Sequence, residues 1–202
     1  MSRGNAILLA IVIAVALIAV AADSVLHDGV SSRAKPTALE TMMAREVRHM
    51  AIPASARKLQ NPAAETQENL RDARLHFADH CAICHANDGS GDTPMGRNLY
   101  PKPPDLRREE TQNLPDGELF WIIENGVRFT GMPAFGGAQG SEQDSWKLVR
   151  FIRRLPQLTG EERMEMERYN PKGPEDLEEE QEENDFLRGA PMQQKPEETH
   201  HH

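Results

Sequence analysis

Apolar residues follow three patterns along this chain, and the first is a continuous run near the N-terminus. Ala6 to Ala22 is an apolar segment of about 17 residues between Arg3 and Asp23. That length is at the lower limit for a membrane-spanning helix and just above the apolar core of a signal peptide. Ala19-Val20-Ala21 resembles a cleavage site, but the length favours an uncleaved anchor over residues 1–22. Either interpretation exports the rest of the chain, and Arg3 places it on the outer face of the membrane.

The second pattern is an amphipathic repeat within a linker that we place at residues 23–64. Thr37 and Glu40 form a capping-box pattern, which is typical of a helix start. Five apolar residues then recur at helical spacing: Leu39, Met42, Met43, Val47 and Met50. The sequence predicts a helix that ends near Ala51 and lies on the membrane, on a partner or on the following domain. A proline-containing, extended strap leads from it to residue 64.

The third pattern predicts a small all-α domain over residues 65–158. Leu70, Ala73 and Phe77 share one helical face, and Ser141 and Asp144 resemble another capping box. The expected helices cover about 65–77, 116–124 and 141–155. We expect a globule of about four helices with little or no sheet.

Two cysteines and a histidine stand directly after the first of these helices. Cys81-Ala82-Ile83-Cys84-His85 has the C-x-x-C-H spacing at which a c-type haem is attached. The two thiols are suited to thioether bonds with one porphyrin, and the imidazole of His85 is then placed to ligate the iron. A redox dithiol does not need the histidine. A zinc site would need a second cysteine pair, which this chain does not have. The motif therefore predicts one covalent haem c held by Cys81, Cys84 and His85.

A methionine in a small-residue loop completes the predicted iron site. Met132 lies in Gly131-Met132-Pro133-Ala134-Phe135-Gly136, where glycine allows close approach to a flat ring and proline stiffens the loop. A His/Met pair suits electron transfer, because the thioether raises the reduction potential. We predict Met132 as the distal ligand, with Met95, His76 and His80 as weaker alternatives.

These motifs resemble the class I monohaem cytochromes c over about Leu70 to Leu155. Phe77 matches the aromatic residue before the first cysteine, and Leu148 and Phe151 match positions of the last helix. The resemblance implies a cytochrome c-like globule and places a backbone carbonyl near Pro94 on the imidazole of His85. Ala73 departs from the family, which usually has glycine where the first and last helices cross. The proline-rich run at residues 100–106 is expected to cover a haem edge.

The acidity of the chain is confined to its C-terminal part. The net charge is −9, and the segment from Glu161 onward holds 14 acidic and 5 basic residues. Residues 159–202 are therefore expected to form a disordered or partner-ordered tail. The rest of the chain is balanced in charge, which argues against nucleic-acid binding.

Together these patterns predict a membrane-anchored, one-electron carrier rather than an enzyme. The haem domain is expected in the periplasm, on the outer face of a bacterial inner membrane. The expected partners are redox proteins, including subunits of a respiratory complex, and neither nucleic acid nor a small-molecule substrate. Two other classes stay open: a haem enzyme or gas sensor with a displaceable sixth ligand, and a scaffold that acts through its tail.

Overall fold

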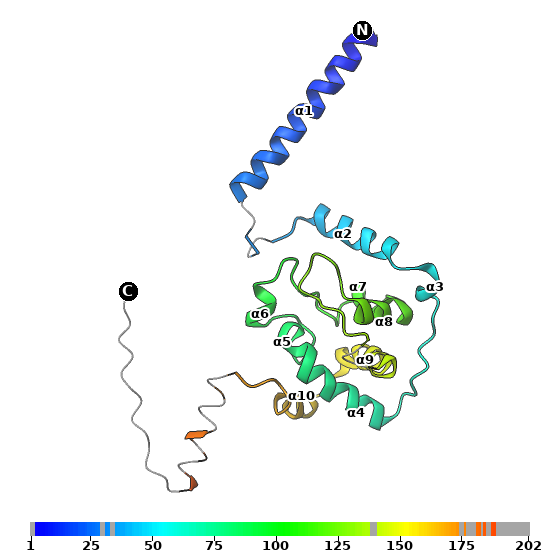
Figure 1. The fold of residues 1–202 in the computed structure, drawn as a ribbon, viewed down its shortest axis with the longest axis vertical. Coiled ribbons are helices and arrows are strands. Elements are labelled where there is room, and N and C mark those ends of the chain that lie inside the picture. The colour runs from blue at the N-terminus through cyan, green and yellow to red at the C-terminus, as the bar shows by residue number, and fades with distance from the viewer. Residues whose placement is uncertain are drawn as a thin grey trace, which may run out of the picture.

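Every regular element of the described chain is helical. The computed structural model describes residues 3–28, 31–32, 35–137, 141–173, 176, 181–182, 184 and 187–188. Figure 1 shows a long helix, α1, standing apart from a globule in which shorter helices gather. The elements are α1 (Arg3–Asp28), α2 (Ala38–Ala51), α3 (Ala54–Arg57), α4 (Gln67–His76), the π-helical turn η1 (Phe77–Cys81), α5 (Ala82–His85), α6 (Pro94–Arg97), α7 (Glu109–Gln112), α8 (Asp116–Asn125), α9 (Glu142–Arg154), the 3₁₀ turn η2 (Leu155–Gln157) and α10 (Gly160–Glu167). The prediction of an all-α fold is confirmed for this part of the chain.

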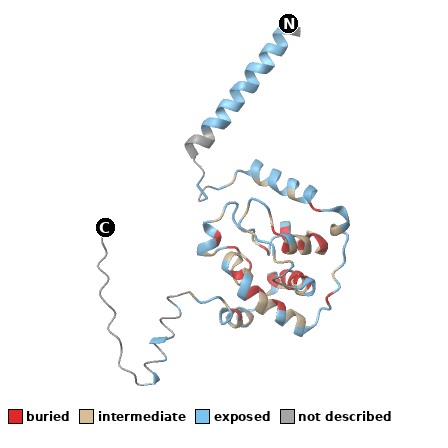
Figure 2. Cartoon of the chain, viewed as in Figure 1, coloured by how far each residue is buried: buried red, intermediate tan, exposed pale blue. Residues whose placement is uncertain are grey.

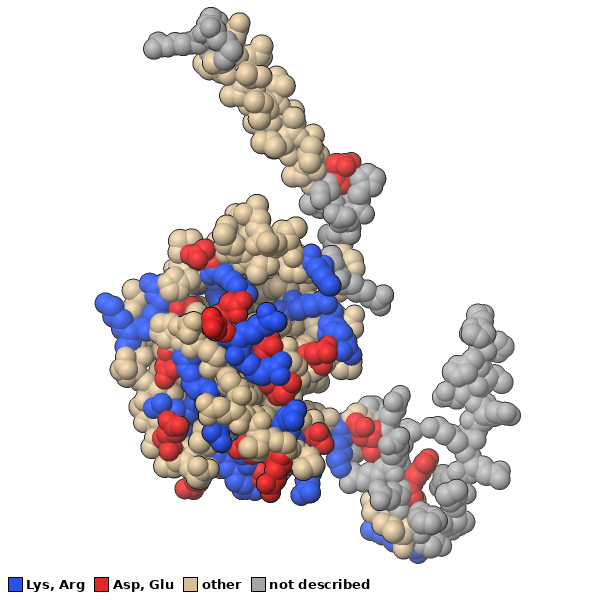
Figure 3. All heavy atoms as spheres, turned by 180° about the vertical axis from the view of Figure 1, so that it is seen from behind, with Lys and Arg blue, Asp and Glu red and all other residues tan. Residues whose placement is uncertain are grey.

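Helix α1 is long and apolar enough to cross a membrane. Its segment Gly4–Asp23 has a mean hydropathy of 2.8, and none of it is buried in the protein. Figure 3 shows this helix almost free of charged side chains, whereas both signs of charge are spread over the globule. A signal sequence near an N-terminus shares this length and composition.

The core of the globule forms where α4 crosses α9. Ala73 is 1% exposed there, and the rings of Phe77 and Phe151 pack with centroids 5.2 Å apart. The ring of Phe120 in α8 stacks on that of Trp146 in α9, with centroids 4.0 Å apart. Helix α8 is therefore the third helix that packs into this core. Figure 2 shows the buried residues concentrated in these helices. Alanine therefore fits the crossing where the resembling family usually has glycine.

Local signals in the sequence mark the starts of α2 and α9 and the end of α8. Thr37 and Glu40 form the predicted capping box, with the Glu40 amide donating to the Thr37 hydroxyl at 3.2 Å. Ser141 and Asp144 form the second one. Gly126 ends α8 with φ +65°, a conformation that glycine adopts without strain.

The second capping box predicts a pH-dependent stability difference. The Ser141 hydroxyl donates to the Asp144 carboxylate at 2.7 Å, and this bond holds the pKa of Asp144 below its ordinary 3.8. A lowered folded-state pKa stabilises the fold above pH 3.8, and the effect is lost as pH falls through the lowered value. We expect Asp144→Asn to reduce the free energy of unfolding by about 0.5–1 kcal/mol at pH 7. In urea titrations this difference should disappear in acid, whereas Glu142→Gln, which removes a charge without this bond, should give a smaller difference at pH 7.

The strap between α2 and α4 is bound to α9 by its backbone and side chains. The Asn61 amide nitrogen donates to the Trp146 carbonyl at 3.0 Å, and the Arg150 guanidinium donates to the Ala63 carbonyl at 3.1 Å. Ile52 is 1% exposed, so the strap also contributes to the buried interior. The short helix α3 within the strap was not predicted.

Helix α10 shows that ordered structure continues past residue 158, where the sequence predicted the tail to begin. Met166 is completely buried against the core, and Thr159 caps the helix. Arg74 of α4 forms ion pairs with Glu162, at 2.8 Å, and with Glu165. The acidic side chains at the start of the tail therefore bind α4. The densest acidic stretch, Glu178–Glu180, and the terminal His200–His202 lie outside the described residues.

Two methionines of α10 test whether this helix belongs to the folded domain. Met166→Ala should lower the free energy of unfolding by about 2–5 kcal/mol, because it removes a buried side chain from a packed site. Met164 is 59% exposed, so Met164→Ala should stay within about 0.5 kcal/mol of the parent protein. Urea unfolding of both variants measures this difference, and equal effects would show that α10 is not part of the cooperative core.

Candidate haem site

The C-x-x-C-H motif lies on a continuous helical segment that leaves the core. The π-helical turn η1 ends at Cys81, and α5 carries Cys84 and His85. Both thiols are free rather than joined in a disulfide, and Cys81 packs against the core. The ring of Phe77 lies 6.4 Å from the imidazole of His85, which gives the predicted aromatic neighbour a structural role. Ala86 then turns the chain away with φ +59°.

Burial leaves all three groups uncharged at neutral pH. Burial, and then the proximity of Cys84, raises the pKa of the Cys81 thiol to about 12, and burial also raises that of Cys84. Burial lowers the pKa of His85 to about 4, and the Pro104 carbonyl opposes this effect without prevailing. A neutral imidazole keeps a lone pair for a metal ion, so His85 is suited to bind iron without first losing a proton.

The backbone carbonyl that acts on His85 belongs to Pro104, and the prediction of Pro94 was wrong. The Pro94 carbonyl instead accepts a hydrogen bond from the Asn98 amide at 2.9 Å. The buried Nδ1 atom of His85 has no partner in hydrogen-bonding geometry, although the Pro104 carbonyl is close enough to affect the pKa. A buried donor without a partner is unfavourable, so this carbonyl is the natural group to orient the ring.

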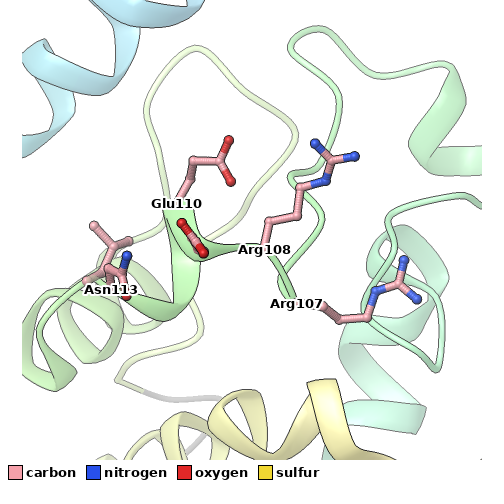
Figure 4. Close-up of a pocket in the computed structure, with 6 residues that line it drawn as sticks. Arg107, Arg108, Glu110 and Asn113 are labelled. Carbon is pink, nitrogen blue, oxygen red and sulfur yellow. The ribbon is translucent and has the colours of Figure 1, made fainter.

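An arginine holds the two loops that surround His85. Arg107 binds Asp105, which follows Pro104, and also Asp88, which follows His85, both at 2.8 Å. The Leu106 amide donates to the Gly89 carbonyl at 2.8 Å, which adds a backbone bond between the same loops. Figure 4 shows Arg107 and Arg108 beside a shallow surface pocket that continues over Glu109, Glu110, Asn113 and Leu114. No pattern in the sequence indicated this role for Arg107.

The loop that carries Met132 is closed by hydrogen bonds onto the end of α8. The Val127 amide donates to the Met132 carbonyl at 3.1 Å, and the Met132 amide donates to the Thr130 hydroxyl at 3.1 Å. The Phe135 amide then donates to the Ile123 carbonyl at 3.0 Å. Met132 itself is half-buried. The loop is therefore a defined support for its side chain rather than an unsupported connection.

The segment from Thr93 to Leu99 connects the two halves of the site. The Thr93 hydroxyl donates to the Ile83 carbonyl at 2.7 Å, and a Cβ added to Gly96 would lie 2.7 Å from the Cys84 carbonyl oxygen. At the other end, a Cβ added to Gly131 would lie 2.7 Å from the Leu99 side chain. Glycine at both positions thus brings the cysteine motif and the Met132 loop against one common segment.

The alternative ligands lie in less suitable places. Met95 is 48% exposed on α6. His80 pairs with Asp79 at 3.2 Å, and its ring lies 4.9 Å from that of His76. Burial, followed by the nearby His80, lowers the pKa of His76. These two histidines contact each other at the surface, and neither has the loop support found around Met132.

Comparison with known families identifies the class of the globular domain. Residues 68–152 match the model of the family described as cytochrome c oxidase, cbb3-type, subunit III. No curated protein matches the chain. Two free thiols, a neutral buried imidazole and a supported methionine are a donor set that fits a haem. Residues 68–152 therefore form a c-type cytochrome haem domain, of the class that carries electrons. The particular family named by the match is that of the cbb3-type subunit, and the match leaves out α1, α2, the strap and the tail.

Proposed function

We propose that this protein carries one electron at a time on a single, covalently bound haem c. Cys81 and Cys84 form the thioethers, His85 is the proximal ligand and Met132 is the distal ligand. This proposal rests on one observation: a single segment, Thr93 to Leu99, contacts both ligand-bearing segments. Gly96 packs against the cysteine motif, and Leu99 packs against the Met132 loop. When bound, the haem supplies an iron that changes by one electron.

The residues of the chain set the conditions for that change. His85 offers an uncharged imidazole, and the Pro104 carbonyl orients it. The thioether of Met132 favours the reduced iron and raises the reduction potential. The packed core behind Cys81 excludes water, which disfavours the additional charge of the oxidised state.

We further propose that α1 anchors the domain on the periplasmic face of a bacterial inner membrane. Four segments follow from this: an anchor at 1–22, a linker at 23–64, the haem domain at 65–158 with α10 added to it, and an acidic tail. The matching family takes its description from a subunit of an oxidase. A respiratory electron-transfer complex is therefore the proposed context, with redox proteins as donor and acceptor.

The state of the sixth ligand tests this function against its main rival. We expect the oxidised, haem-loaded protein to show a near-red sulfur-to-iron band, and the reduced protein to leave its spectrum unchanged under carbon monoxide. A reversible one-electron titration should accompany both results. Ready binding of carbon monoxide, with no such band, would instead favour a haem enzyme or gas sensor. Deleting the tail distinguishes a carrier from a scaffold that acts through its tail. A carrier without the tail should still reduce its partner at the same rate.

A further inference from the structure

Helix α2 turns its apolar face toward solvent rather than toward the domain. The side chains on this face are each between 56% and 70% exposed: Leu39, Met42, Met43, Val47 and Met50. No residue of α2 is buried, and Figure 2 shows the helix exposed along most of its length. A surface helix normally buries such a stripe in the core. The apolar stripe of α2, meaning these five residues, therefore lacks its usual cover among the described residues.

The opposite, polar face of α2 binds the haem domain. The Nδ1 atom of His49 lies 3.0 Å from the Glu118 carboxylate of α8. The Arg45 guanidinium lies 3.8 Å from the Glu110 carboxylate of α7. These contacts come from two separate helices of the domain, so they fix which side of α2 faces it.

The ends of α2 are held as well. At its start, the Tyr100 hydroxyl donates to the Glu40 carboxylate at 2.5 Å, and this bond lowers the pKa of Glu40 and raises that of Tyr100. At its end, the side chain of Ile52 is buried in the domain. Helix α2 can therefore not rotate to bury its apolar stripe without breaking contacts at both ends.

A buried acidic side chain, Glu118, helps to hold α2 in this orientation. Glu118 is 0% exposed, and its carboxylate has His49 as its hydrogen-bonding partner. Arg48 of α2 is also close, since burial lowers its pKa while Glu118 opposes that effect. Removing α2 from this position would break the hydrogen bond to Glu118 and separate Arg48 from it, which is unfavourable.

The path of the chain brings the apolar stripe to the membrane. Helix α1 ends at Asp28 and α2 begins at Ala38, so residues 29–37 connect them. A connection of this length spans at most about 35 Å when fully extended. If α1 is the anchor, the start of α2 is therefore held within that distance of the lipid headgroups. Lys35, exposed in this connection, adds a cation suited to anionic headgroups.

We propose that the apolar stripe of α2 lies on the lipid surface and so fixes the orientation of the haem domain on the membrane. This inference rests on the proposed anchor. Glu46 is exposed on the same face of α2 as the stripe, so α2 lies at the level of the headgroups rather than in the hydrocarbon interior. The polar face then holds the domain against the membrane in one orientation, which limits the directions from which a redox partner can reach it.

Spin labels on the full, haem-loaded chain test this proposal. Because Cys81 and Cys84 are consumed by thioethers in the haem-loaded protein, an introduced cysteine is the single free thiol. Met43→Cys labels the stripe, and Glu68→Cys labels α4, which Figure 1 shows on the far side of the globule from α2. Val12→Cys labels α1. Each protein is reconstituted into vesicles of phosphatidylethanolamine and phosphatidylglycerol, and collision with oxygen is compared with collision with a water-soluble nickel complex. An unchanged haem spectrum shows that each variant is folded.

The three labels give separate outcomes for the stripe and for the anchor. We expect the oxygen-to-nickel ratio at position 43 to be several-fold higher than at position 68 and lower than at position 12. Equal ratios at 43 and 68, with a high ratio at 12, would overturn the lipid contact while the anchor stands. A low ratio at 12 would refute the anchor and the inference with it. Shielding of position 43 from both reagents would show a protein partner or second copy on the stripe, and would also overturn the proposal.

Discussion

Replacing Met132 with alanine should open the sixth coordination position of the iron. We expect complete loss of the near-red sulfur-to-iron band, binding of carbon monoxide to the reduced protein, and a lower reduction potential, because the thioether favours reduced iron. The loop should keep its shape, since its hydrogen bonds join the backbone of residues 127, 132 and 135 rather than the Met132 side chain. Absorption spectra and a redox titration measure all three changes.

Met95 supplies the matched control for this experiment. It is the other methionine near the cysteine motif, on α6, and its exposed side chain can be removed without disturbing the core. Met95→Ala should keep the band, the reduction potential and the resistance to carbon monoxide. If Met95→Ala lost the band and Met132→Ala kept it, the assignment of the distal ligand would pass to Met95. If both kept it, the sulfur ligand proposed here would be wrong.

Local signals were sufficient for the helices because each signal acts within a few residues. Thr37 with Glu40 and Ser141 with Asp144 form bonds across one helical turn, and sequence spacing alone specifies such bonds. Apolar spacing predicted the helices that became α4 and α9, and the resemblance to the cytochromes c implied that they cross near Ala73. These parts of the fold were therefore predictable from the sequence.

Contacts between distant segments were not predictable in the same way. Met166 is an isolated apolar residue in an acidic stretch, so no periodic pattern marked it as core, and only its position beside α4 explains its burial. Pro104 reaches His85 because Arg107 and Leu106 pair with the loop after the haem motif. A proline-rich run predicts a covering segment but does not specify which carbonyl meets the imidazole.

Helix α2 shows what a correct pattern leaves undetermined. Its repeat identified the helix and the apolar face, but periodicity does not say what that face contacts. The polar face is instead held on the domain, where His49 contacts the buried side chain of Glu118 and Arg48 lies close to it. Among the three locations that the sequence left open, the structure places the polar face on the domain. The apolar face stays exposed for the lipid contact proposed here.

The double variant Cys81→Ser/Cys84→Ser should lose covalent haem completely. Serine is close to cysteine in size but cannot form a thioether, so haem should be removed by denaturing electrophoresis or acid extraction. Each single variant retains one thiol, and we expect it to keep a smaller amount of covalent haem. Mass spectrometry of the intact chain measures the added mass of the haem in each case.

Ile83 provides the control that separates thioether chemistry from helix disruption. It lies between the two cysteines on α5 and is 50% exposed, so Ile83→Ala changes the same short helix without removing a thiol. Ile83→Ala should retain one haem per chain. Because His85 and Met132 stay in place in the double variant, it is expected to bind added haem reversibly, with the spectrum of a His/Met site. Covalent haem on the double variant would show that the attachment does not depend on these cysteines, and would refute the proposed site at its first step.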